Sequence, residues 1–517
     1  MKTNLTLLAA FCLCNLTMVN AQTVKDALII SQEFNGGTAR FKGMGNASSA
    51  LGGDISSISG NPAGLGFFGQ SDISITGNLL SGKNSTNYFG DSNSKTKNNF
   101  GIDNAGVVFH FPTYKSGGNL DQGWINFNIG ASYDKVNNFT NQLLYSGTNN
   151  SSTIVQSYTD LMADFQDWEE DFKNSNLVEQ YADANNGYFP LTGSISNKYH
   201  SNQLIESGNK SRSNISFGGN YSNKFYFGLS VGFTSLTYNA NKQFSEEGWT
   251  VFPADVIADN PNSDYADPTN PKSRYLDKNY LLYDDYNLAT RGSGYDFKFG
   301  FIYKPKEDWN LGLTIQSPTW MTINEEYYTN QEASFYENEQ ATSAFDTFYL
   351  TYDTYSEYNI RTPFKFNVGA TKFFNRGLIT ADAEFVDYGS TKISYFGNTN
   401  RNEETLINED IKNAYKPALN VKLGGEMLFN AILSGRAGLN YYGNPYKNAD
   451  QTQWNGSVGL GVKLTNAMYL DLAVVHSMTN YNENPYLINE DFWGVASPDA
   501  EIKLNRTNAV MTLGVKF

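Results

Sequence analysis

The chain has 517 residues and a formal net charge of -15, with 37 Lys and Arg against 52 Asp and Glu. Phosphates repel so acidic a chain, so nucleic acid is excluded as an expected partner. The acidic residues gather in connecting segments such as residues 160–171 and 255–285, where they are expected to solvate loops.

Residues 1–21 have the features of a secretory signal peptide. Lys2 precedes the apolar run 5–13, and Val19-Asn20-Ala21 places a small residue before the expected cleavage point. The apolar run is too short to span a bilayer. The only two cysteines, Cys12 and Cys14, lie within it. The mature chain is therefore expected to use neither disulfides nor thiol chemistry.

Residues 22–71 are rich in glycine and small residues and show no regular alternation. A segment of this length before a wide barrel predicts a plug that folds inside the barrel. Its marked positions are Gly43, Gly45, Asp54 and the run Asn61-Pro62-Ala63-Gly64-Leu65. Proline fixes its own φ and asparagine bonds locally, so this run predicts a kinked corner that shifts when ligand binds.

From residue 72 onwards, apolar residues alternate with small polar ones. Trp454, Val458 and Leu460, for example, share one face of a strand, whereas Ser457 and Gly459 share the other. About fourteen such segments are present, which predicts an all-β, antiparallel transmembrane β-barrel over residues 72–517. The predicted strands are 72–80, 100–111, 124–135, 213–221, 224–236, 294–304, 309–320, 363–373, 377–388, 418–428, 431–442, 453–464, 468–478 and 507–517.

The composition of the two strand faces predicts their orientation. The polar face consists mainly of Gly, Ser, Thr and Asn, which suits a wet and crowded interior, so the Phe-, Leu- and Val-rich face is expected to meet lipid. Short turns such as Ser222-Asn223 alternate with long outer loops, and the terminal aromatic residue Phe517 is expected to act as the assembly signal. The expected long loops are 136–212, 237–293, 321–362, 389–417 and 479–506.

One outer loop carries apolar residues at helical spacing. These are Tyr158, Leu161, Met162, Phe165, Trp168 and Phe172. The spacing predicts one apolar face of a helix. This face serves either as a landing site for an apolar solute or as a surface that packs on neighbouring loops and caps the barrel.

Charged residues also fall on the predicted lumen face. Alternation brings them to one side of adjacent strands, where opposite charges can pair across the sheet: Asp382, Glu384, Lys422, Glu426 and Arg436. The predicted role is a structural ladder, with solute binding as the alternative.

The three histidines form no metal-binding spacing. His110 and His476 fall on predicted strands, and His200 falls in a predicted long loop. Nothing marks a nucleophile for a serine–histidine hydrolase. The sequence therefore predicts no enzyme, no metal and no cofactor.

The N-terminal segment resembles the signature of the FadL/TodX-type outer membrane transporters. The matching residues are Ala39-Arg40, Gly43 to Ala47, Asp54 and, above all, residues 61–65, which stand directly before the first strand. The resemblance extends over most of the chain, although the outer loops match poorly. It implies a monomeric fourteen-stranded barrel with an N-terminal plug. It also implies uptake of long-chain fatty acids or aromatic hydrocarbons, with exit through a gap in the barrel wall. Such a gap needs broken strand pairing, and the candidate positions are Gly130, Asp134 and Asn137-Asn138 in the third strand; the alternative is that the strand glycine only relieves crowding.

Together these patterns predict a bacterial outer membrane channel for passive uptake of hydrophobic small molecules. The expected partners are the hydrophobic ligand, outer membrane lipid and the barrel assembly machinery. The alternatives are a porin-like or receptor barrel for another small molecule or peptide, and an adhesin that binds through its loops.

Overall fold

The computed structural model describes residues 24–34, 36–114, 121–164, 169–193, 197–397, 401–449 and 451–517. The predicted signal peptide, both cysteines, Phe165 and Trp168 lie outside the described residues. No helix among the described residues is long and apolar enough to cross a membrane.

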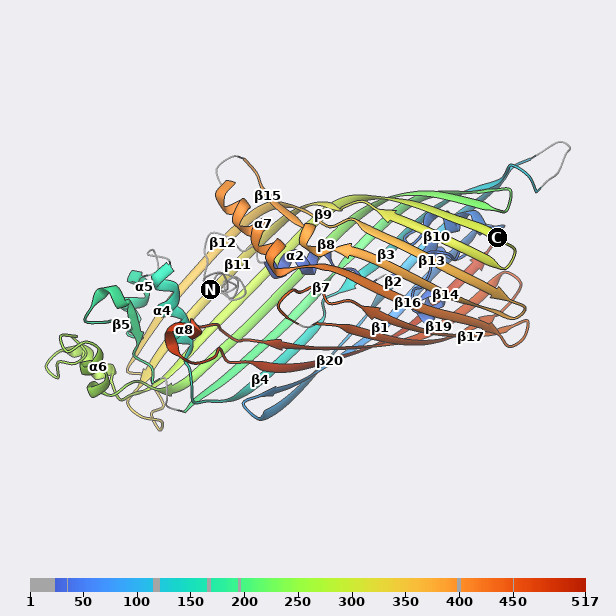
Figure 1. Ribbon diagram of the computed structural model, residues 1–517. Coiled ribbons are helices and arrows are strands. Elements are labelled where there is room, and N and C mark those ends of the chain that lie inside the picture. Colours follow the sequence, from blue (N-terminus) through green and yellow to red (C-terminus); the bar gives the residue numbers. More distant parts are fainter. Residues whose placement is uncertain are drawn as a thin grey trace.

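The chain forms a closed antiparallel barrel of fourteen strands, which confirms the predicted fold class (Figure 1). The first strand pairs with the last from Asp72 opposite Lys516 to Asn87 opposite Glu501, which closes the sheet. The barrel strands are β1 (Asp72–Tyr88), β2 (Asp91–Pro112), β3 (Trp124–Asn138), β7 (Lys198–Tyr221), β8 (Phe225–Trp249), β9 (Asn279–Lys306), β10 (Trp309–Gln316) continued by β11 (Trp320–Tyr336), β12 (Asp346–Arg361) continued by β13 (Lys365–Phe374), β14 (Gly377–Asp387), β16 (Pro417–Leu428), β17 (Leu433–Tyr442), β18 (Gln453–Lys463), β19 (Met468–Glu483) and β20 (Ala500–Lys516).

Two barrel strands are interrupted at neighbouring prolines, Pro318 and Pro363, which lack the N–H that a ladder needs. The interruption is bridged locally, because the amide of Thr319 donates to Thr362 Oγ1 at 2.8 Å and the amide of Thr362 donates to the Thr319 carbonyl at 3.1 Å. The wall therefore continues across both prolines.

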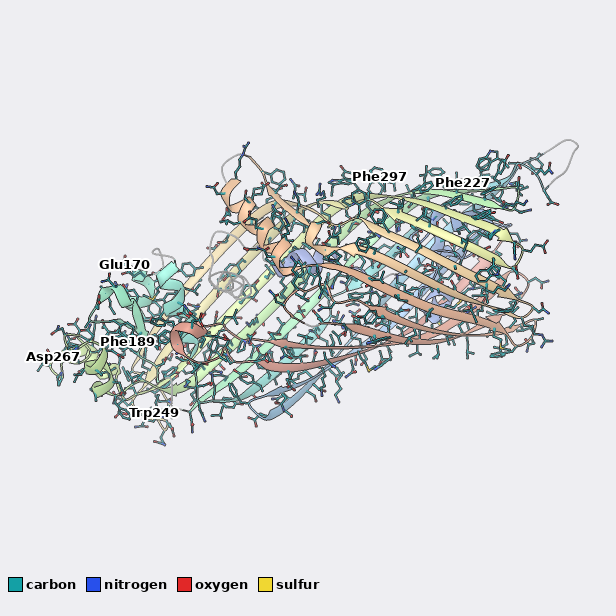
Figure 2. The ribbon with its side chains drawn as sticks, viewed as in Figure 1. Glu170, Phe189, Phe227, Trp249, Asp267 and Phe297 are labelled. Atoms are coloured by element: carbon teal, nitrogen blue, oxygen red, sulfur yellow. The ribbon has the colours of Figure 1, made fainter. Side chains whose placement is uncertain are left out.

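The apolar strand faces point outwards, as predicted from the sequence. Phe227 and Phe297 project from the outer surface near the short-turn end of the barrel (Figure 2). Leu229, Val458 and Leu460 are likewise exposed on this surface. Soluble proteins bury such a belt, whereas a bilayer covers it.

Four strands run much further beyond the membrane belt than the sequence predicts. The expected loops 237–293 and 321–362 consist largely of the outer parts of β8, β9, β11 and β12, which pair without interruption over many residues. The expected loop 136–212 contains the outer half of β7. These predictions were wrong because the outward residues there are polar: outside hydrocarbon the backbone ladder persists, but the apolar alternation does not.

The ladder between β2 and β3 covers only part of their length. It runs from Asn104 opposite Asp134 to Pro112 opposite Asn126, and within the described residues it goes no further towards the outside. Beyond it, β4 (Asn141–Asn149) pairs with β7 and lies under the hairpin of β1 and β2. Side chains make this contact: Thr86 Oγ1 donates to the Leu144 carbonyl at 2.9 Å. We call this incomplete ladder the β2–β3 seam.

The outer mouth is covered by a cap of short elements (Figure 1). The cap contains α4 (Ile154–Asp164), α5 (Glu169–Asn174), β5 (Val178–Gln180), η4 (Ala184–Asn186), β6 (Tyr188–Pro190), α6 (Pro253–Asp259), η5 (Pro271–Tyr275) and α8 (Glu490–Trp493). Beside it lie η6 (Tyr388–Ser390), β15 (Lys392–Tyr395) and α7 (Arg401–Ala414). Inside the barrel lie α2 (Val24–Ser31), α3 (Ala39–Gly43), η1 (Ile55–Ser57) and η2 (Pro62–Phe67), which form the N-terminal segment.

A charge in the outward belt should cost more than the same charge further out. Leu229, 61% exposed, lies in the middle of the apolar run of β8, whereas Tyr349, 62% exposed, lies on β12 between Thr347 and Thr351. We expect Leu229→Arg to lower the free energy of unfolding in lipid vesicles by about 2–4 kcal/mol. Tyr349→Arg, the matched control, should change it little. Equal losses in urea titrations of both variants would contradict the position of the belt.

Candidate functional site

The N-terminal segment rests on glycines that face into the barrel. Gly218, Gly228 and Gly300 lie opposite one another on β7, β8 and β9. A Cβ atom built at Gly228 would overlap the backbone of Pro62 and Ala63. Side chains at these positions would thus fill the space that the 61–65 turn occupies.

Hydrogen bonds hold this turn against the wall. The side-chain nitrogen of Asn61, Nδ2, donates to the Ser49 carbonyl at 2.5 Å, and its side-chain oxygen, Oδ1, accepts from the Ala63 backbone N–H at 3.0 Å. Asn128 Nδ2 on β3 donates to the Leu65 carbonyl at 2.6 Å. Gly64 is buried in the same turn. The turn therefore contacts both the wall and the rest of the N-terminal segment.

The other marked residues of the segment hold its remaining turns. Gly45 has a φ of 65° and lies against β16 and β17, and a Cβ atom built at Gly43 would lie 3.3 Å from the Cα atom of Gly459. Asp54 caps η1 by accepting from the backbone N–H of Ser56 at 2.9 Å, and it accepts from Thr38 Oγ1 at 2.8 Å.

The five charged residues of the predicted ladder all lie inside the barrel. Arg436 bonds to Glu426 at 2.6 Å, and Lys422 lies 4.0 Å from Glu384. Two of the acids also hold the N-terminal segment. Glu426 accepts bidentate hydrogen bonds from Arg40, and Asp382 accepts a hydrogen bond from the backbone N–H of Ser48 at 2.7 Å. The charges thus join the wall to the segment as well as joining strand to strand.

A second ion-pair cluster surrounds Glu33, in the turn that follows α2. One carboxylate oxygen lies 2.8 Å from Lys210 Nζ and 2.7 Å from Arg212 Nη2, and the other lies 2.7 Å from Lys365 Nζ. We call these three cations the clamp. All three side chains are buried. Burial alone would raise the pKa of Glu33, but the charges of Arg212, Lys210 and Lys365 hold this pKa well below its ordinary value of 4.5.

Next to the clamp lies an apolar chamber of the bore, which α2 fills. Its wall is formed by buried side chains of the strands and of the connections and short helices between them: Tyr88, Phe139, Leu143, Tyr145, Leu204, Leu236, Tyr238, Ala240, Leu288, Met321, Ile323, Tyr358, Ile360, Val386, Tyr388, Ile393, Ile411, Tyr415, Ala418, Ala500 and Ile502. Val24, Ala27, Leu28 and Ile30 of α2 are buried among them. Such a lining does not suit a water-filled pore, because contact between apolar surface and water is unfavourable in free energy.

Along β7 these features follow one another as levels of the bore. Gly218 marks the level at which the 61–65 turn contacts the wall, and Arg212 and Lys210 mark the clamp. Leu204 marks the chamber and His200 marks the cap. Alternation places all five residues on the inner face, because their positions differ by even numbers.

The predicted apolar helix of the outer loop is two helices, α4 and α5. Tyr158, Met162 and Phe172 are buried in the cap, and Leu161 packs against the same cluster. Phe165 and Trp168 lie outside the described residues. The described part of this face therefore packs within the cap and is not exposed as a landing surface.

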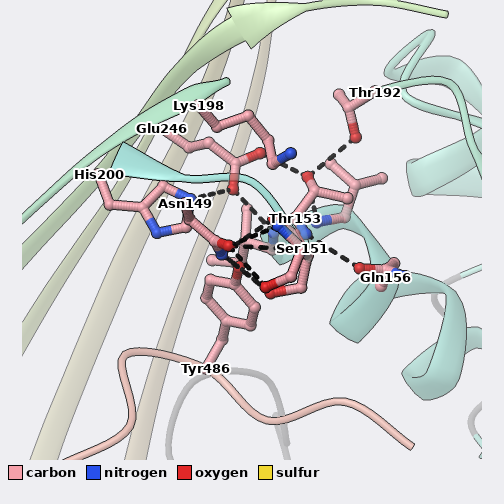
Figure 3. A network of polar contacts seen from close by, with 12 residues as sticks. Asn149, Ser151, Thr153, Gln156, Thr192, Lys198, His200, Glu246 and Tyr486 are labelled. Atoms are coloured by element: carbon pink, nitrogen blue, oxygen red, sulfur yellow. Dashed lines mark hydrogen bonds and ion pairs between the residues drawn. The ribbon is translucent and has the colours of Figure 1, made fainter. Parts of the chain in front are cut away.

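A buried polar network joins the cap to the barrel (Figure 3). Glu246 on β8 accepts hydrogen bonds from Thr153 Oγ1 at 2.5 Å and from the backbone N–H of Ile154 at 3.0 Å, at the start of α4. His200 bonds to Glu246 through Nε2 at 2.9 Å and to the Tyr88 hydroxyl through Nδ1 at 2.8 Å. The placement of His200 in a loop was wrong, because β7 extends to Lys198.

This network lacks the arrangement of a hydrolase. Among the described residues, the second nitrogen of His200 bonds to a tyrosine and not to a serine or threonine hydroxyl. The described residues also contain no group of three or more His, Cys, Asp or Glu side chains placed to hold a metal ion.

The β2–β3 seam opens onto an internal cavity of about 140 Å³. Asp103 on β2 and Lys135 to Asn138 on β3 line it, together with Phe34 and Lys42 of the N-terminal segment. Lys42 also pairs with Asp103. Of the predicted gap positions, Asp134 ends the ladder and Asn137-Asn138 lie beyond it. Gly130 was a wrong choice, because it is paired with Val108 and packs on Ile58.

Sequence reasoning missed Glu33, the clamp and the chamber. The even positions Lys210 and Arg212 are in phase with the inward residues Asn214 and Ser216 of the predicted strand 213–221. Extending that alternation backwards would have placed both cations in the lumen. No pattern marks Glu33, since it lies in a turn.

The sequence matches no protein-family model and no curated protein. The fold, however, is that of known outer membrane channels. The toluene transporter TodX of P. putida superposes with a TM-score of 0.53 at 13% identity, with 94% of this chain and 99% of that chain covered. A Pseudomonas aeruginosa FadL homologue gives a TM-score of 0.50 at 12% identity, with 94% and 99% covered. The chain thus has the FadL/TodX-type fold and is an outer membrane β-barrel.

The stabilising effect of Glu33 should depend on pH. Because its pKa is lowered in the folded protein, its contribution is complete above 4.5 and is lost as the pH falls through the lowered value. We expect the difference in melting temperature between the wild type and Glu33→Gln to be constant between about pH 5 and pH 7. It should shrink below 4.5. A difference that disappears near neutral pH would show that Glu33 is not held ionised by the clamp.

Proposed function

We propose that the protein is a passive outer membrane channel for hydrophobic small molecules such as long-chain fatty acids. The observation that carries this proposal is the apolar chamber in the middle of the bore, lined by residues from nine of the fourteen barrel strands and from outer-loop elements. Such a lining favours the transfer of an apolar solute from water by about 25 cal/mol per Å² of buried apolar surface. The solved structures that share the fold include a toluene transporter, which agrees with this class of solute.

Two features support a route through the channel. The N-terminal segment fills the bore and is held to the wall by hydrogen bonds and ion pairs as well as by apolar contacts, so it is the proposed gate. The β2–β3 seam is the proposed lateral exit, because the wall there lacks a continuous ladder and an internal cavity adjoins it. By leaving sideways into the bilayer, an apolar solute would avoid passing through the polar end of the bore.

A porin-like function is less well supported. The described part of the bore contains the N-terminal segment, paired charges and a cap, and the cavities among them at the clamp and seam levels have volumes of about 60 and 140 Å³. An adhesin would need no apolar chamber.

The gate can be tested at the 61–65 turn. Replacing Asn61 and Pro62 together by Ala removes the side-chain hydrogen bonds of Asn61 and the fixed φ of Pro62. The turn should then no longer be held in its position against the wall. Each lost hydrogen bond is worth about 1 kcal/mol, which predicts a loss of about fivefold or more in uptake of a labelled apolar solute by cells. Barrel assembly should be unchanged.

The matched control is a second Asn-Pro pair in the cap. Asn270 caps η5 with Pro271 behind it, and its side chain accepts from the Lys272 backbone N–H at 3.0 Å. Replacing this pair by Ala should leave uptake unchanged. Equal uptake by both double variants at equal surface level would remove the support for gating by the turn.

The exit can be tested by filling the cavity at the seam. Val136 is buried and lines this cavity, so Val136→Trp should obstruct it. We expect uptake to fall by about tenfold or more, the effect of an added barrier of about 1.4 kcal/mol. Val368→Trp, on the exposed outward face of β13, is the control. Normal uptake by the Val136→Trp variant would place the exit elsewhere.

A further inference from the structure

Beyond the membrane belt, the outer wall of the barrel carries a groove of about 690 Å³, which we call the wall groove. It lies on the outward face of β7, β8, β9, β11 and β12, because residues that alternate with its lining, such as Leu288, are buried in the chamber. Two rows of outward residues cross these five strands side by side and line the groove. One row is Ile205, Asn241, Asn287, Tyr328 and Asp353, and the other is Ser207, Asn239, Ala289, Glu326 and Tyr355. Four interstrand spacings make the groove roughly 19 Å long, which is the length of a short oligosaccharide.

Two tyrosine rings stand at one end of the wall groove. Tyr328 on β11 is 43% exposed, and Tyr355 on the neighbouring strand β12 is 61% exposed. The hydroxyl of Tyr355 donates to Asn324 Oδ1 at 2.7 Å, which restricts the position of the ring. A tyrosine ring offers an apolar face and a polar edge. A sugar ring has the same two features, so the pair forms a suitable stacking surface for sugars.

The floor of the groove carries side-chain amides that are already ordered. Asn241 Nδ2 donates to Asn287 Oδ1 at 2.8 Å, and Arg291, beside the groove, donates to Asn239 Oδ1 at 3.0 Å. Each amide can both donate and accept hydrogen bonds, as a sugar hydroxyl does. An acyl chain could use none of these groups.

The charge of the groove favours a neutral ligand. Glu326 and Asp353 are exposed carboxylates within it. The described residues that line it include no Lys or Arg. Carboxylates accept hydrogen bonds from neutral hydroxyls, but they repel phosphates and other acids.

The position of the groove indicates where such a ligand comes from. On β9 the exposed apolar run through Phe297 ends at Tyr295, whose ring centroid lies 5.6 Å from that of Trp320. Ala289 and Asn287 lie six and eight residues further out. This is about 20–26 Å along a strand tilted by 35–45°, or about 15–20 Å above the apolar run. A phospholipid head extends only about 5–8 Å beyond the hydrocarbon, so a lipid that reaches the groove must carry a longer head.

We propose that the wall groove binds the neutral sugars of a glycolipid in the outer leaflet. The acyl chains of this lipid lie against the apolar belt, and its sugars extend up the same wall to the groove. There the two tyrosines stack on sugar rings, while the asparagines and carboxylates bind their hydroxyls. The groove lies on the outer side of the wall, so this proposal does not depend on the route of a solute through the bore.

The test uses the full chain in phosphatidylcholine vesicles that contain gangliotetraosylceramide, a glycolipid with a neutral tetrasaccharide head. After extraction into a non-ionic detergent, native mass spectrometry measures the glycolipid retained per chain. We expect Tyr328→Ala combined with Tyr355→Ala to lower retention by about tenfold, because both stacking surfaces are lost. Both side chains are exposed, so the variant should fold normally. Tyr349→Ala, on the same face of β12 and 62% exposed, is the matched control and should not change retention.

Two further measurements test the charge and the source of the ligand. The ganglioside that adds one sialic acid to the same head should be retained less well, and Asp353→Asn should narrow this difference. The free tetrasaccharide should bind much more weakly in titration calorimetry, because it has no acyl chains to hold it at the belt.

Two results would overturn the sugar site: no retention of the neutral glycolipid by the wild type, or equal retention by the double variant and the Tyr349→Ala control. Binding of the free tetrasaccharide as tight as that of the glycolipid would overturn its assignment to a membrane lipid. None of these results would bear on uptake through the bore, which is measured separately.

Discussion

The structure depends on a backbone ladder that closes on itself. In hydrocarbon each unpaired N–H or C=O costs several kcal/mol, so a sheet can cross the membrane only when its last strand returns to its first. Here β20 pairs with β1 over sixteen positions, from Asp72 to Asn87. Closure turns one strand face towards lipid and encloses the other, and every polar or apolar feature of the bore is built on that enclosed face.

Closure also determines how the interior is filled. A sheet of fourteen strands encloses more space than its own small side chains occupy, and the N-terminal segment takes up that space. Its backbone lies directly on wall glycines such as Gly228 and Gly424, at distances that a side chain would not permit. Its charges are matched by the wall, Arg40 with Glu426 and Glu33 with the clamp. Buried charges need such partners, so the segment and the wall are energetically one unit.

At the seam the wall relies less on its backbone ladder than along the neighbouring β3–β7 pair. Outside Asp134, side chains such as Thr86 take over contacts that backbone groups make elsewhere. The N-terminal segment reaches this place through Lys42, which pairs with Asp103. Movement of the segment would therefore act on a part of the wall whose ladder is incomplete. This connection is what allows the proposed gate and the proposed exit to work together.

The sequence by itself determined the strand pattern, the strand number, the closed barrel and the outward orientation of Leu229 and Val458. The reason is that alternation with a period of two, and the apolar or polar composition of each strand face, can be read within each strand segment. It also placed Asp382, Glu426 and Arg436 on the inner face. Only the tertiary structure decided which residues meet across the bore. The clamp joins Glu33 to residues more than 170 positions away, and the chamber draws on strands from both ends of the chain. Such contacts depend on barrel closure and on the path of the N-terminal segment, and neither leaves a periodic signal in the sequence.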